Sequence, residues 1–147
     1  LLGVGQDATD EGQIQGTQVS VFDVTDLSDP TRLDTFTLDN GTSSQVEYDH
    51  HAFLYWDGLA VVPVQQYWWE EGKDERFMGA IGLRIEDSGE INVLGDIVHP
   101  GGDDTSWDWR SQILRSVVIG DHLFTVSAKG ILKSDLDTLD EITWMGF

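Results

Sequence analysis

The chain has 147 residues, which is enough for one domain with a hydrophobic core. Its 27 Asp and Glu stand against 8 Lys and Arg, and the formal net charge of -19 argues against nucleic acid or anionic lipid as partners. The absence of cysteine excludes disulfides, thiolate metal sites and cysteine nucleophiles. No apolar run approaches the ~18 residues of a membrane helix, so membrane insertion is not expected.

Two explanations fit this acidity. One is halophilic adaptation, in which counter-ions at high salt screen the self-repulsion. The other is cation binding at specific sites. Acidic residues occur in every predicted turn, which favours the first explanation.

The first third of the chain predicts a β-hairpin. Apolar and polar residues alternate over residues 19–24 and again over 33–38, as in strands with one buried face. The polar segment 26–30, which ends in Pro30, has turn chemistry. Residues 1–5 predict a strand that precedes this hairpin.

The middle third predicts four strands. Residues 53–56 and 59–64 flank the hairpin turn Asp57-Gly58, and the nearly continuous apolar character of 59–64 predicts burial on both faces. Pro63 predicts a bulge or an unpaired amide in that strand. A polar loop at 67–76 leads to strands at 78–85 and 91–98.

The last third repeats the pattern, with strands predicted at 113–119, 123–127, 130–136 and 141–145. A four-stranded unit repeated every ~40–50 residues is typical of β-propeller blades, whereas a β-sandwich does not account for the regular repeat. We predict an all-β, partial β-propeller of about three blades at residues 1–48, 49–104 and 105–147, the first incomplete. Since a ring needs ~4–8 blades, we expect the remaining blades from the same protein or from other subunits.

Two motifs carry a resemblance. The segment Phe-Asp-Val-Thr-Asp at 22–26 with Asp29-Pro30, and Tyr-Asp-His-His-Ala-Phe at 48–53, resemble the secreted bacterial and archaeal β-propeller domain that is distantly related to WD repeats. Residues 1–5 and 118–127 fit the same pattern. The resemblance covers nearly the whole chain and implies an extracellular or cell-envelope location. The resemblance implies no catalytic residues in this chain.

The predicted connections fall into two classes. The long ones, at 6–17, 39–49, 65–77 and 99–110, lie on one face of the propeller, where binding sites usually occur. These loops contain the candidate ligand-binding residues Trp68, Trp69, Trp107 and Trp109. Tryptophan rings beside carboxylates suit a protein or glycan ligand, and the alternative is that each ring covers the core beneath its own loop.

His50 is a further candidate, at the junction between two blades. In WD-type blades a histidine at this junction commonly belongs to a buried hydrogen-bond network, and the alternative is a metal ligand with His51 and His99. Because neighbouring strand residues point to opposite faces, His50 and His51 are not expected to share an ion.

Asp7, Asp10 and Glu11 precede Gly12 and could supply oxygen ligands to calcium, although their spacing is not that of an EF-hand. The alternative is a solvated acidic loop.

The chain contains no Gly-x-Ser-x-Gly motif and no glycine-rich phosphate loop. We therefore expect a non-enzymatic scaffold that binds a ligand on the long-loop face. The alternatives are an extracellular propeller hydrolase with carboxylates or a metal in its central channel, and a purely structural module.

Overall fold

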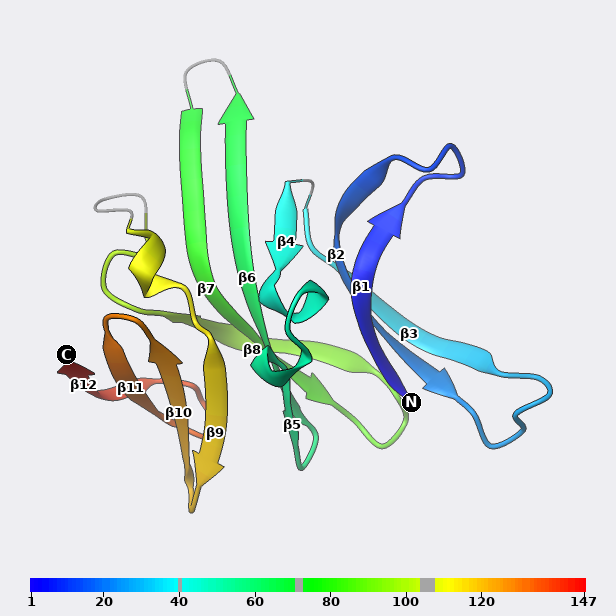
Figure 1. The fold of residues 1–147 in the computed structure, drawn as a ribbon. Coiled ribbons are helices and arrows are strands. Elements are labelled where there is room, and N and C mark those ends of the chain that lie inside the picture. The colour runs from blue at the N-terminus through cyan, green and yellow to red at the C-terminus, as the bar shows by residue number, and fades with distance from the viewer. Residues whose placement is uncertain (40, 71–72, 104–107) are drawn as a thin grey trace.

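The computed structural model describes residues 1–39, 41–70, 73–103 and 108–147, and the side chains of 68–70 and 73–75 lie outside this description. The strands form three antiparallel sheets (Figure 1). The first sheet contains β1 (Leu2–Ala8), β2 (Ile14–Asp23) and β3 (Thr31–Thr37). The second contains β4 (Thr42–Ser44), β5 (Leu54–Trp56), β6 (Leu59–Glu70), β7 (Lys73–Ile85) and β8 (Ile91–Val98). The third contains β9 (Arg115–Ile119), β10 (His122–Ser127), β11 (Gly130–Asp135) and β12 (Glu141–Gly146).

The second sheet is packed between the other two. Leu59 and Val61 of β6 belong to a buried cluster shared with the third sheet, which contributes Leu123 and Leu132. Their neighbours on β6, such as Val62, join a second cluster with Val19 of the first sheet. Successive residues of β6 therefore face opposite neighbours, which confirms the prediction that this strand is buried on both faces.

Consecutive antiparallel sheets packed in this way confirm the predicted all-β, partial β-propeller. The blade limits at residues 48 and 104 stay predictions. β4 pairs with β6, so residues 42–44 already belong to the second sheet. Within the described ranges the remaining regular elements are the 3₁₀ turns η1 (Gln45–Glu47), η2 (His50–Ala52) and η3 (Trp109–Ser111). A search of the same residues finds no helix with the length and apolar character needed to span a bilayer.

The connections separate into two ends of the molecule, as Figure 1 shows. The β1–β2 connection, the β6–β7 hairpin and η3 lie at the upper end, which we call the long-loop face. The β2–β3, β5–β6 and β9–β10 turns lie at the opposite end. The predicted Asp57-Gly58 turn is confirmed, with both residues at positive φ (45° and 78°).

One predicted loop is a hairpin instead. Residues 65–77 were expected to form a long irregular connection, but β6 and β7 stay paired from Leu59 and Arg84 up to Glu70 and Lys73. Strands β6 and β7 extend beyond the other sheets in Figure 1, and the aromatic residues of the segment favour the extended conformation.

Pro63 lies in this strand without a bulge. The register between β6 and β7 runs through Pro63 and Ala80 without a shift. The Pro63 carbonyl instead accepts a hydrogen bond from the Ser44 hydroxyl (2.6 Å) on the other side of the strand. There the partner of β6 changes from β5 to β4, so the missing amide proton of proline falls in a gap of the ladder.

The third sheet begins later than predicted. Strand β9 starts at Arg115, and Ile113, which was expected to open the strand, is fully buried just before it.

Candidate functional site

The inner strand of the second sheet consists of two pieces, β4 and β5, which both pair with β6 and are separated by the turns η1 and η2. This interruption contacts all three sheets. The η1–η2 segment lies between β9 and β1 in Figure 1. The Gln6 amide of β1 donates to the Glu47 carboxylate (2.7 Å). On the other side, Gln112 donates to Gln45 (2.7 Å) and Arg115 forms an ion pair with Asp49 (2.8 Å). Residues 45–52 are therefore the point at which the inner edges of the sheets are joined.

The interruption begins with a capping box. The Ser44 hydroxyl accepts from the Val46 amide (3.2 Å), and the Glu47 carboxylate accepts from the Ser44 amide (2.9 Å). The pattern Ser-x-x-Glu at residues 44–47 could have indicated this turn from the sequence.

The second turn presents two histidines. Asp49 is its N-cap, and its Oδ1 accepts from the His51 amide (3.0 Å). The rings of His50 and His51 are both exposed and lie side by side in a tilted arrangement, with centroids 4.1 Å apart and planes inclined by 38°. The expectation of a buried hydrogen-bond network at His50 is wrong. The prediction that the two histidines point to opposite faces is also wrong, because they lie in a 3₁₀ turn and not in a strand.

The buried histidine is His99, after β8. Its Nδ1 is 2.8 Å from the Ser127 hydroxyl and its Nε2 is 2.8 Å from the Thr125 hydroxyl, both on β10. The rings of His99 and Trp144 pack edge to face, with their centroids 4.8 Å apart. Burial lowers the His99 pKa from 6.5 to about 4. His99 therefore ties the second sheet to the third and does not take part in a metal site with His50.

The third sheet repeats the histidine turn with different side chains. Asp108 is the N-cap of η3, and its Oδ1 accepts from the Arg110 amide at 3.0 Å, the same distance as in η2. The fourth residue of each turn, Ala52 or Ser111, is buried. His50 and Trp109 therefore occupy equivalent positions, each directly after the capping aspartate and before the inner strand. Both are exposed, Trp109 by 65%.

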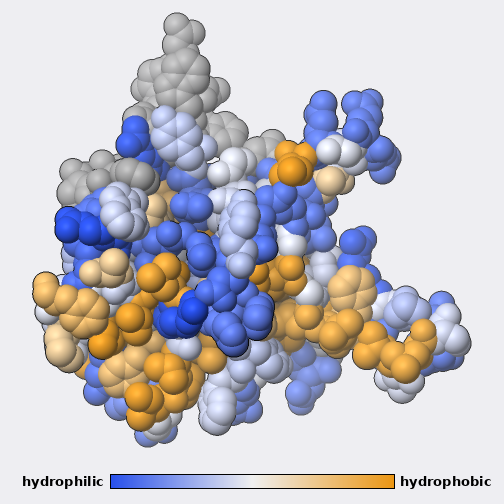
Figure 2. Space-filling model, viewed as in Figure 1, coloured by the Kyte–Doolittle hydropathy of each residue, from blue (hydrophilic) through white to orange (hydrophobic). Residues whose placement is uncertain are grey.

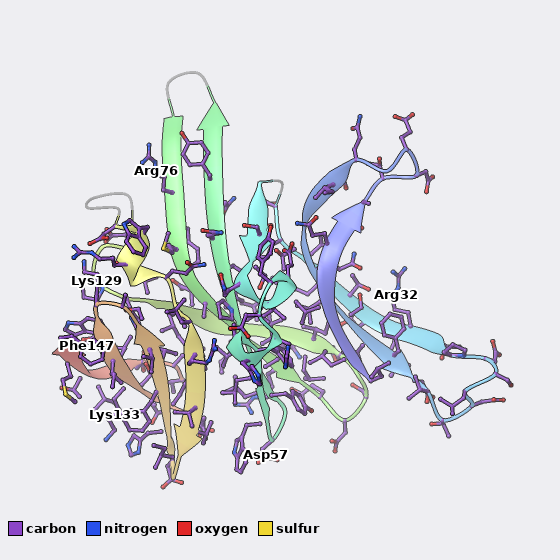
Figure 3. All side chains as sticks on the ribbon, in the orientation of Figure 1. Arg32, Asp57, Arg76, Lys129, Lys133 and Phe147 are labelled. Carbon is purple, nitrogen blue, oxygen red and sulfur yellow. The ribbon has the colours of Figure 1, made fainter. Side chains whose placement is uncertain are left out.

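Each of the two capping aspartates, Asp49 and Asp108, forms an ion pair with a basic side chain. The guanidinium of Arg110 lies 2.7 Å from the Asp108 carboxylate, and these hydrogen bonds hold the pKa of Asp108 far below its usual value. Lys129, next to η3 in Figure 3, lies 3.5 Å from the same carboxylate and donates to the Pro100 carbonyl (2.7 Å). The amide of His51, followed by the ion pair with Arg115, lowers the pKa of Asp49.

Of the four candidate tryptophans, Trp109 is the one whose side chain the structure describes. Its exposure does not fit a ring that covers the core. Trp107 lies outside the described residues, and Trp68 and Trp69 belong to β6 with side chains outside the description. Their role stays a prediction.

The structure does not bring the predicted calcium ligands together. Asp7 pairs with Gly16 in the β1–β2 ladder, and Asp10 and Glu11 are exposed at the turn beyond it. Among the described residues, the donors that converge are those of Asp49, His50 and His51. Calcium binding at the β1–β2 turn stays a prediction, which calcium-dependent melting would test.

A cleft of about 1030 Å³ lies at the end opposite the long-loop face, between the first and second sheets. Its lining includes the acidic side chains of Asp23, Asp57, Glu86 and Asp87. Asp23 is engaged in its own turn, since its Oδ1 accepts from the hydroxyl (2.6 Å) and amide (2.8 Å) of Thr25, which lowers its pKa. The carboxylate of Asp23 is therefore held as a hydrogen-bond acceptor in its ionised form, which does not suit a general acid.

Comparisons with known proteins agree with this architecture. The chain is similar to an uncharacterised protein of the archaeon Methanocaldococcus jannaschii, with 26% identity over 148 residues. The alignment covers 98% of this chain and 18% of that protein. No solved structure matches the chain. A family model described as the beta propeller domain matches residues 1–139, so the chain belongs to the beta propeller domain family.

Proposed function

We propose that this propeller is a non-enzymatic scaffold that binds a protein or glycan ligand on its long-loop face. The observation that carries the proposal is the equivalence of His50 and Trp109. Two successive sheets present an exposed ring at the same position, directly after an aspartate that caps a 3₁₀ turn. Exposed rings held by a rigid scaffold favour binding over a role in the core. The engaged carboxylate of Asp23 in the opposite cleft favours binding over hydrolysis.

A glycan array tests the proposal. The wild-type chain is expected to bind one class of glycan. Trp109→Ala is expected to weaken that binding by at least about tenfold, by analogy with nucleic-acid bases, whose stacking on one aromatic ring is worth ~1–3 kcal/mol. Trp56→Ala is the matched control, because Trp56 is 54% exposed but lies on β5 next to the turn at the opposite end.

Equal losses in Trp109→Ala and Trp56→Ala would contradict the proposal. So would a Trp109→Ala variant that binds like the wild type. Both side chains are more than half exposed, so both variants are expected to fold, and circular dichroism checks this.

We also propose that further blades cover the outer face of the third sheet. One face of the third sheet packs on the second sheet through Leu123 and Leu132, and we call the opposite face its outer face. The outer face also carries apolar residues, and Figure 2 shows hydrophobic residues gathered over this sheet. The apolar residues on that face are half-buried or exposed (Val117, Ile119, Phe124, Val126, Ile131 and Met145), and polar residues such as Arg115, His122 and Lys133 lie among them.

This outer face fits another blade because the opposite face of the same sheet already packs on one. The partners would be other blades of the same protein or other subunits. The mass of the natural protein and its assembly size in solution test this proposal. A stable monomer of 16.4 kDa with no further blades would contradict it.

We propose an extracellular or cell-envelope location, which the resemblance of residues 22–26 and 48–53 to a secreted domain family supports. Fractionation of the cells that produce the natural protein tests the location, and recovery from the cytoplasmic fraction would contradict it.

A further inference from the structure

The η2 turn places three metal-binding groups together. One nitrogen from each of His50 and His51 and one carboxylate oxygen of Asp49 lie within 4.8 Å of one another. All three come from consecutive residues, so the turn itself determines their arrangement, and no distant packing has to be correct for the groups to meet.

A local hydrogen bond holds one of the groups, the Asp49 carboxylate, in place. Asp49 Oδ1 is bound to the His51 amide (3.0 Å), which fixes the carboxylate against the turn that carries both rings. The ring centroids are 4.1 Å apart, and one nitrogen of each ring lies within 4.8 Å of the other and of a carboxylate oxygen of Asp49. Both histidines are exposed, and small rotations about their side-chain bonds can shorten the separations to those of a shared ion.

Arg115 completes the surroundings of the carboxylate. It reaches Asp49 Oδ2 from β9 at 2.8 Å, which leaves lone pairs of both oxygens for a further ligand. A hydrogen-bond donor outside the ligand shell commonly orients a metal-binding carboxylate. The excess of acidic residues over the whole chain also attracts cations and offsets the charge of this arginine.

The donor set selects the kind of ion. Two imidazole nitrogens and one carboxylate oxygen suit Zn²⁺ and its first-row neighbours, whereas Ca²⁺ and Mg²⁺ prefer oxygen alone. Three protein ligands leave a coordination position open for water or for a ligand atom.

We propose that Asp49, His50 and His51 bind one Zn²⁺ ion with an open coordination position, at the junction of the inner edges of the three sheets. His99 is not a ligand, because both of its ring nitrogens contact hydroxyls of β10. The equivalent turn of the third sheet, Asp108-Trp109-Arg110, has the same backbone hydrogen bond but no imidazole and does not bind the ion.

Isothermal titration with Zn²⁺ tests the site, in a buffer of about pH 8 that contains Ca²⁺ and Mg²⁺ in excess to saturate weak acidic sites. One ion per chain is expected. His50→Ala and His51→Ala are each expected to weaken binding by at least about tenfold. His122→Ala is the matched control, because His122 lies on β10 in another part of the fold and its variant should bind Zn²⁺ like the wild type.

An NMR spectrum of the imidazole protons provides a second readout that does not depend on affinity. Zn²⁺ is expected to shift the ring signals of His50 and His51 and leave those of His99 and His122 in place. The proposal is overturned by an absence of Zn²⁺ binding, or by binding that persists unchanged in both His50→Ala and His51→Ala.

Discussion

The side chain of Leu139 lies directly over Gly82, at the position that a Cβ atom on this glycine would occupy. Leu139 belongs to the β11–β12 turn of the third sheet, has a positive φ of 65° and is buried. Gly82 belongs to β7 of the second sheet and pairs with Gly95 of β8. Two paired glycines thus form a recess that receives a side chain from the neighbouring sheet.

Gly82→Ala should destabilise the fold by about 1–3 kcal/mol, because the added methyl group forces Leu139 out of the recess. Gly95→Ala is the matched control: the same substitution in the paired residue meets the same Leu139 atom at 3.9 Å, an ordinary contact. Chemical denaturation of both variants measures the difference. A Gly82→Ala variant as stable as Gly95→Ala would show that the recess does not hold the sheets together.

The sequence predicted the features that depend on periodicity. Alternation revealed the hairpin of β2 and β3, and the continuous apolar run revealed that Leu59 and Val61 lie in a strand with two buried faces. The recess at Gly82 could not be predicted, because it depends on a side chain that comes from another sheet.

The candidate site was only partly predictable for a different reason. His50 was recognised as a candidate, but the wrong local structure was assumed, because Asp49 was not considered as an N-cap. A comparison of Asp-His-His-Ala with Asp-Trp-Arg-Ser, at 49–52 and 108–111, would have indicated two equivalent turns. The exposure of His50 and the buried hydrogen bonds of His99 could not be predicted from the sequence pattern, since each depends on packing.

Asp34 connects the outer edges of the first and second sheets. Its Oδ2 accepts from the Ile91 amide of β8 (2.8 Å), its Oδ1 accepts from the Thr35 amide (2.8 Å), and the bond from Ile91 lowers its pKa the most. Asp34→Ala should lower the denaturation midpoint because the Ile91 amide loses its partner. Since the folded pKa is lowered, this contribution is present at neutral pH and is lost as the pH falls through the folded pKa.

Asp29→Ala is the control for Asp34→Ala, because it removes the same charge from the β2–β3 turn of the same hairpin, where Asp29 is exposed. Equal midpoints for the two variants would mean that the bond to Ile91 does not stabilise the contact.

The melting temperature should rise with salt concentration if the acidity is an adaptation to salt. The net charge of -19 produces self-repulsion, which ions screen over ~10 Å at 0.1 M and ~3 Å at 1 M. NaCl and KCl should raise the melting temperature equally, and CaCl₂ should add nothing beyond its ionic strength. A response to CaCl₂ alone would instead favour specific cation sites and contradict the adaptation.

The stability of the fold should decrease as the pH falls from 6.5 to 4, in part because of His99. Burial lowers the folded pKa to about 4 from the ordinary value of 6.5, so between these values the unfolded chain binds a proton that the folded chain does not. The contribution of His99 to the free energy of unfolding is therefore fully present above pH 6.5. It is lost progressively below that pH, by about 3 kcal/mol at most.

Denaturation at a series of pH values, for the wild type and for His99→Gln, isolates this contribution from that of the carboxylates. Glutamine can keep hydrogen bonds to Ser127 or Thr125 but does not titrate, so the variant should lose less stability across this interval. Direct NMR titration of the His99 ring in the wild type covers the case in which the variant does not fold. A ring that titrates near 6.5 would contradict the assignment, because it would mean that protonation costs the folded state no more than it costs the unfolded chain.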